Sequence, residues 1–159
     1  MRVAVELAAQ IGAAIGTQLS PAPAARVHGG SINECYRWES RRGPLFVKVA
    51  DASRHAMLAG EAAGLEALRA AQAVRVPHVL GCAVDAGQAW LALEWLELGS
   101  AAARAEAQLG TRLALQHRQV ADAFGWSQDN TIGRTLKKTN LNLIYKSNGL
   151  SRRMVTPHS

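Results

Sequence analysis

Lys48 is the side chain with the clearest potential for chemistry, because it is the only lysine among the first 133 residues. It lies in the run Pro44-Leu45-Phe46-Val47-Lys48-Val49, whose composition predicts a β-strand. A compact ammonium on an otherwise apolar strand needs an anion, and Glu61 follows in a helical segment. The two side chains together predict a phosphate-binding pair. Each taken alone also fits an ordinary solvated residue, Lys48 on a sheet face and Glu61 on a helix.

Two other segments could contact the same ligand. Gly29-Gly30-Ser31 ends the first predicted strand, where flexible backbone would let N–H groups approach phosphate oxygens. Gly-Gly is also a common turn signal with no further role. Glu94-Trp95-Leu96 closes the last predicted strand before Gly99-Ser100, and its backbone could bind an adenine edge. The alternative is an edge strand in which Trp95 only fills space in the packing.

The hydrophobic pattern predicts an α+β fold in which an antiparallel sheet positions these residues. Helical spacing of apolar residues predicts helices at 3–19, 54–73 and 109–123. Alternation and turn residues predict strands at 26–31, 33–40, 44–50, 79–84 and 89–96, with a turn at Asp85-Ala86-Gly87-Gln88. Since residues two apart on a strand share a face, Phe46 and Lys48 should lie opposite Leu45, Val47 and Val49.

The charge of the chain is confined to its last segment. Residues 1–133 contain 12 basic and 12 acidic residues, whereas residues 134–159 contain six basic residues and no acid, which gives the formal charge of +6. A neutral folded part argues against nucleic acid or a membrane as partner. Cys35 and Cys82 show neither zinc-ligand nor disulfide spacing, and no run reaches about 18 apolar residues. A cytoplasmic location is therefore expected.

Several stretches resemble the fructosamine kinase, or ketosamine-3-kinase, family, relatives of aminoglycoside and choline kinases. The matching stretches are Gly29 to Asn33, Gly43 to Lys48, Glu61 to Leu68, Val76-Pro77, Leu93 to Leu96, Leu109-Gly110, Leu113-Ala114, His117, Phe124 to Trp126 and Asp129 to Gly133. The resemblance covers roughly residues 3 to 135. It implies a protein-kinase-like N-terminal lobe with a five-stranded antiparallel sheet, a packed helix and an N-terminal helix.

The resemblance also implies roles for the residues singled out above. Lys48 would bind the phosphates of ATP, Glu61 would orient Lys48, and Glu94-Trp95-Leu96 would form the adenine hinge. Family members use Mg²⁺ with ATP and phosphorylate the 3-hydroxyl of a sugar on a glycated amine or protein. The expected organisation is an ATP-binding lobe at 1–97, a hinge and first helix of a second lobe at 98–133, and a basic, disordered tail at 134–159.

The sequence departs from the family at Thr135. The family's His-Gly-Asp-Leu catalytic loop and metal-binding Asp have no counterpart, and no acidic residue follows Asp129. If the parent gene encoded Thr-Pro-Gln-Lys-Asn at this point, the loss of one base would shift the reading frame and produce Thr135 to Thr139. A frameshifted tail is therefore one hypothesis. An evolved basic tail that binds an anionic partner is another. The chain is expected to be inactive alone. The alternative is a non-catalytic module that binds a nucleotide or a partner and self-associates through its exposed lobe interface.

Overall fold

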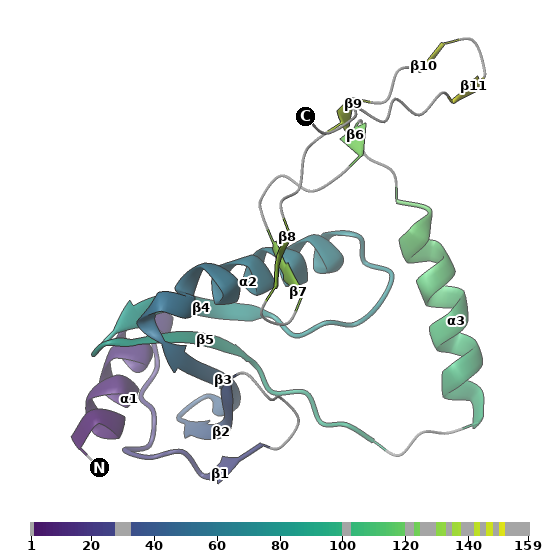
Figure 1. Ribbon diagram of the computed structural model, residues 1–159. Coiled ribbons are helices and arrows are strands. Elements are labelled where there is room, and N and C mark those ends of the chain that lie inside the picture. The colour runs from purple at the N-terminus through teal and green to yellow at the C-terminus, as the bar shows by residue number, and fades with distance from the viewer. Residues whose placement is uncertain are drawn as a thin grey trace, which may run out of the picture.

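A five-stranded antiparallel sheet, in the lower left of Figure 1, is the largest sheet of the described residues. The computed structural model describes residues 2–27, 33–99 and 103–119, with strand residues 123–124, 130–132, 135–137, 142–143, 146–147 and 150–151. The strands are β1 (Ala25–Arg26), β2 (Glu34–Ser40), β3 (Gly43–Asp51), β4 (Val79–Asp85) and β5 (Gln88–Glu94). Their order across the sheet is β1-β2-β3-β5-β4. Strand β3 is therefore central and has a partner on both sides.

Helix α1 (Arg2–Ile15) covers one face of this sheet (Figure 1). Its side chains join the alternate residues of β2, β3 and β5 in a core that contains Leu7, Ala8, Ile11, Leu19, Trp38, Leu45, Val47, Val49, Trp90 and Ala92. Leu45, Val47 and Val49 are buried here, as the period of two predicts. The indole N–H of Trp38 donates to the carbonyl of Ser20 at 2.8 Å, which satisfies its polar atom inside the core.

Helix α2 (His55–Ala70) covers the opposite face and follows the 3₁₀ turn η1 (Ala52–Arg54). Asp51 begins this turn, and its carboxylate accepts from the backbone N–H of Ser53 at 2.9 Å. Leu58 is fully buried against Ala89, Leu91 and Leu93 of β5. The sheet is therefore enclosed by α1 on one side and α2 on the other, in agreement with the α+β lobe expected from the sequence.

The turn between β4 and β5 is the one predicted from Asp85 to Gln88. Ala86 has φ 49° and Gly87 has φ 74°, so both central residues are left-handed, as in a type I′ hairpin. Asp85 also accepts from the indole N–H of Trp90 at 2.9 Å. This contact fixes the end of the hairpin to the core.

Several predicted element boundaries are wrong. The first helix ends at Ile15 instead of residue 19, because Gly16 is left-handed and Thr17 N–H bonds to the carbonyl of Gly12. The first strand is only Ala25–Arg26 where it is described. The last strand ends at Glu94, since the register places Pro44, which has no N–H, opposite the following residue.

The third helix, α3, spans Ala103–His117 and begins six residues before the predicted position. It stands apart from the sheet in Figure 1, and Arg112 donates to the carbonyl of Ala73 at 3.3 Å. Beyond it lie the short pairs β6 (Ala123–Phe124) with β9 (Asn142–Leu143), β7 (Asn130–Ile132) with β8 (Thr135–Lys137), and β10 (Lys146–Ser147) with β11 (Leu150–Ser151). In the described part of the chain, no helix has the length and apolar character to cross a membrane.

Candidate functional site

Lys48 and Glu61 meet on the face of the sheet that α2 covers. Lys48 is on β3, with its side chain on the side opposite Leu45, Val47 and Val49, and Glu61 lies in the second turn of α2. The distance from Lys48 Nζ to Glu61 Oε1 is 2.6 Å. The side chains remain 22% and 34% exposed, so the ammonium can still reach a ligand. The structure thus brings together the pair that the sequence predicted.

Both cysteines lie near this pair because of the strand register. Cys35 on β2 is the direct partner of Lys48, and Cys82 on β4 is the partner of Leu91, which itself faces Lys48. Burial raises the pKa of the Cys35 thiol, and the Lys48 ammonium partly offsets this rise. Burial also raises the pKa of Cys82, with a further contribution from the Glu61 carboxylate. Both groups are therefore neutral thiols that surround one charged pair.

A hollow of about 270 Å³ opens beside the ion pair. It is lined by Phe46, Lys48, Glu61, Leu65, Pro77, Leu93, Glu94, Leu96 and Leu98. Six of the nine lining residues are apolar, three from β3, α2 and β5 and three from the segments before β4 and after β5, while the ion pair provides the charged part of the wall. Such a combination suits a flat apolar group attached to an anion.

Glu94 forms hydrogen bonds through both its side chain and its backbone. One carboxylate oxygen accepts from Arg75 at 3.2 Å and the other from the backbone N–H of His78 at 3.2 Å. The backbone N–H of Glu94 donates to the carbonyl of His78 at 2.9 Å. This N–H is therefore not free for a ligand, so a backbone N–H that donates to a bound base would have to come from Trp95 or Leu96.

Trp95 and Leu96 occupy different positions beside the hollow. Leu96 lines it directly. Trp95 does not line the hollow; its ring lies 6.4 Å from that of Phe46, and the guanidinium of Arg37 on β2 lies 5.4 Å from the centroid of the Trp95 ring. Gly29-Gly30-Ser31, predicted to approach phosphate oxygens, lie outside the described residues.

The sequence interpretation missed Arg75 and His78, which hold Glu94 in place. Their partner is 19 and 16 residues away, respectively, and neither lies in a periodic segment. The pairing of Val79 with Leu93 at the start of β4 brings them together, and no local pattern predicts it. Among the described residues, no three His, Cys, Asp or Glu side chains gather as a metal site requires.

Comparison with known proteins identifies the family. The model of the family described as "Fructosamine kinase" matches residues 3–145. The chain belongs to the fructosamine kinase family. The matched range continues about ten residues beyond the position where the sequence resemblance was expected to end, and so enters the basic segment.

Relatives of this fructosamine kinase family chain extend well beyond the part that it shares with them. A probable ketoamine kinase of Synechocystis sp. is 41% identical over 110 residues, which cover 69% of this chain and 37% of the relative. A chloroplastic protein-ribulosamine 3-kinase of Arabidopsis thaliana is 35% identical over 113 residues, or 69% of this chain and 34% of the relative. The chain therefore spans about a third of the length of these curated relatives.

Solved structures agree on the fold. A protein described as a fructosamine-3-kinase from Haemophilus somnus superposes with a TM-score of 0.75 at 21% identity, over 86% of this chain and 47% of the other. Another, from Thermobifida fusca, gives a TM-score of 0.70 at 27% identity, over 87% and 48% of the two chains. The five-stranded sheet with its helices is thus the fold that these proteins share with this chain.

Proposed function

We propose that this chain binds ATP in the hollow beside Lys48 and Glu61, as the nucleotide-binding lobe of a fructosamine kinase family protein. The 2.6 Å contact between Lys48 Nζ and Glu61 Oε1 at one end of an apolar hollow carries this proposal. One ammonium proton binds Glu61, and the two others are available for phosphate oxygens. Glu61 fixes the direction of the ammonium and lowers the entropy lost when ATP binds.

The apolar wall would hold the adenine ring. Phe46 and Leu93 project from neighbouring strands, and Leu96 and Leu98 follow β5 on the chain. Their contacts exclude water from the base, while the backbone of the segment Glu94-Trp95-Leu96 supplies its hydrogen bonds. The turn Gly29-Gly30-Ser31 would cover the phosphates from the other side. The base and the phosphates are then held by different ends of one hollow.

The family reaction needs more residues than this lobe supplies. Transfer of the γ-phosphoryl group breaks its bond to the β-phosphate oxygen and forms one to a sugar hydroxyl, which loses its proton. That chemistry uses one carboxylate to position the hydroxyl and others to hold Mg²⁺, which neutralises the developing charge. No acidic residue follows Asp129, and no metal-binding cluster occurs among the described residues. We therefore propose that this chain binds ATP but does not transfer phosphate alone.

The relatives' names suggest the acceptor class of the complete activity. They are called ketoamine kinase and protein-ribulosamine 3-kinase. We propose a glycated amine, phosphorylated at the sugar 3-hydroxyl, as the acceptor once the catalytic residues are present. The organisation that goes with this role is an ATP lobe at 1–97, a connecting segment at 98–133 and a basic tail at 134–159, in a cytoplasmic protein.

A non-catalytic binding module is the second candidate. On α3, Leu109 and Leu113 lie one turn apart and are 54% and 41% exposed, and Leu115 is 47% exposed. Large exposed aliphatic side chains on one helix favour association with another surface. Self-association through α3 would leave the hollow beside Lys48 accessible, so the two candidates differ in whether ATP binds.

Isothermal titration with Mg-ATP tests the proposal on the full chain. The wild-type protein should bind, and Lys48→Met and Glu61→Gln should each weaken binding by about tenfold, the effect of losing a hydrogen bond to a charged group. Glu66→Gln is the matched control, because Glu66 is on the same helix and pairs with Arg69 instead. No heat from the wild type at millimolar ATP, or an equal loss in the control, would contradict ATP binding at this site.

A further inference from the structure

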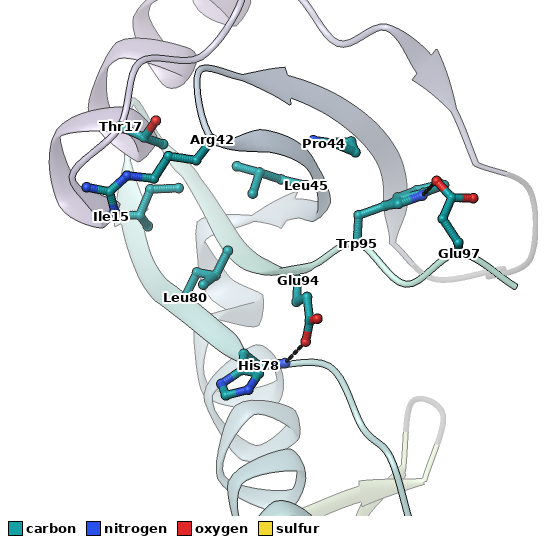
Figure 2. A pocket seen from close by; sticks show the side chains of 10 residues that line it. All are labelled: Ile15, Thr17, Arg42, Pro44, Leu45, His78, Leu80, Glu94, Trp95 and Glu97. Atoms are coloured by element: carbon teal, nitrogen blue, oxygen red, sulfur yellow. Dashed lines mark hydrogen bonds between the residues drawn. The ribbon is translucent and has the colours of Figure 1, made fainter.

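A second and larger hollow lies on the face of the sheet that carries α1 (Figure 2). Its volume is about 560 Å³, within the range of small-molecule sites. It is lined by Ile15, Thr17, Arg42, Pro44, Leu45, His78, Leu80, Glu94, Trp95 and Glu97. Of these residues, only Glu94 also lines the hollow beside Lys48, so the two hollows adjoin at Glu94 and otherwise have different walls.

The apolar floor of this hollow depends on an irregularity in β4. The pairing of β4 with β5 shifts between Val79 and Gly81, which leaves Leu80 as the extra residue of a bulge. Bulges redirect a side chain, and Leu80 lines the hollow with Ile15 and Leu45 (Figure 2). Leu80 remains 40% exposed, although it is a large aliphatic residue. The bulge therefore places an apolar side chain where a ligand can cover it.

The polar residues of the hollow differ in whether their charges are already matched. Both carboxylate oxygens of Glu94 accept hydrogen bonds, from Arg75 and from the backbone N–H of His78. Glu97 accepts from the indole N–H of Trp95 at 2.9 Å, a neutral donor that does not match its charge, but Glu97 lies at the end of the hollow away from the Arg42 guanidinium (Figure 2). Arg42 is exposed in the turn between β2 and β3 and lines the hollow, and within the described part of the chain its guanidinium has no hydrogen bond or ion pair. An arginine without a partner beside an apolar wall favours a carboxylate or phosphate.

We propose that this hollow binds a small organic acid whose anion pairs with Arg42. The apolar body of the acid lies over Ile15, Leu45 and Leu80, and an aromatic end extends toward Trp95. The guanidinium provides two parallel donors for the anion, and burial of the body provides the remaining affinity. Arg42, Leu45 and Leu80, which hold the anion and the body of the acid, do not line the hollow beside Lys48, so this site does not require bound ATP.

The test is an amide NMR titration of the full chain with 4-phenylbutyrate at physiological salt. This acid should bind with a Kd of roughly 1 mM, as expected for a ligand of its size. Its neutral amide, 4-phenylbutanamide, should bind about fivefold more weakly, and 4-phenylbutylamine should bind no better than the amide. The shifted resonances should belong to the residues around Leu80 and Trp95.

Two arginine variants locate the anion. Arg42→Gln should remove the preference for the acid over the amide, whereas Arg41→Gln, next to it in the same exposed turn, should keep that preference. Leu80→Glu should abolish binding, because it places a carboxylate in the apolar wall. Equal affinity for acid and amide in the wild type, or loss of the preference in both arginine variants, would overturn the proposal. So would shifts confined to the hollow beside Lys48, or the absence of binding at 10-fold the expected Kd.

Discussion

The coupling free energy of the Lys48–Glu61 ion pair should be larger than that of an exposed surface pair. The two charged atoms are 2.6 Å apart, and the side chains are 22% and 34% exposed. Exposed pairs contribute about 0–1 kcal/mol, while breaking a fully buried pair costs about 3–5 kcal/mol. Water reaches both groups here, so we expect a coupling free energy of about 1–2 kcal/mol between these limits.

A double-mutant cycle measures this coupling directly. The free energy of unfolding would be measured by urea titration for the wild type, Lys48→Met, Glu61→Gln and the double variant. A second cycle on Glu66 and Arg69 of α2 is the matched control, since that pair is spaced i,i+3 and both side chains are 45% exposed. The control should give about 0.2–0.5 kcal/mol.

The reasoning fails if the Lys48–Glu61 cycle gives no more coupling than the Glu66–Arg69 cycle. Salt provides a second criterion. Raising the salt concentration from 0.1 M to 1 M should reduce the control coupling more than the Lys48–Glu61 coupling, because partly buried charges are screened less. A coupling that disappears at 1 M salt would mean that the pair behaves as a solvated one.

Three further outcomes follow from local geometry. Gly81→Ala should cost about 1–3 kcal/mol in urea unfolding, because the added Cβ would lie 3.1 Å from ring carbons of Trp90. Ala86→Asn should stabilise the fold by about 0.5–1 kcal/mol in the same assay, because asparagine tolerates φ 49° better than alanine; a loss of stability would contradict this. In a chain without the other thiol, the ultraviolet absorbance of the Cys35 thiolate should appear with a midpoint above pH 9.0, and Lys48→Met should raise this midpoint further, since the ammonium lowers this pKa. A midpoint that falls in the variant would refute that assignment.

Local pattern predicted the type and order of the elements and the buried face of β3, although not all of the element boundaries. The alternation through Leu45, Val47 and Val49 predicted the buried side of β3, and Asp85 to Gln88 predicted the hairpin turn. The isolation of Lys48 and the spacing to Glu61 predicted the ion pair, because a strand followed by a helix that packs on it brings these positions together. Each of these features depends on residues that are near in the sequence.

Features that depend on pairing between distant strands did not follow from the pattern. The bulge at Leu80 arises where β4 and β5 change register, and the engagement of Glu94 by Arg75 and His78 follows from the same pairing. The end of α1 at Ile15 required the left-handed conformation of Gly16. Strand register is set by the packing of both sheet faces at once, so a window of sequence carries little information about it.

The sequence alone carried the family resemblance in its motifs, and its periodicity and local spacing predicted the α+β fold and the pair Lys48 and Glu61. Tertiary structure alone decided which groups surround that pair and which remain without a partner. The register places Cys35 opposite Lys48, and folding leaves the guanidinium of Arg42 beside an apolar hollow. Both arrangements join residues from separate elements, and only the packed sheet brings those elements together.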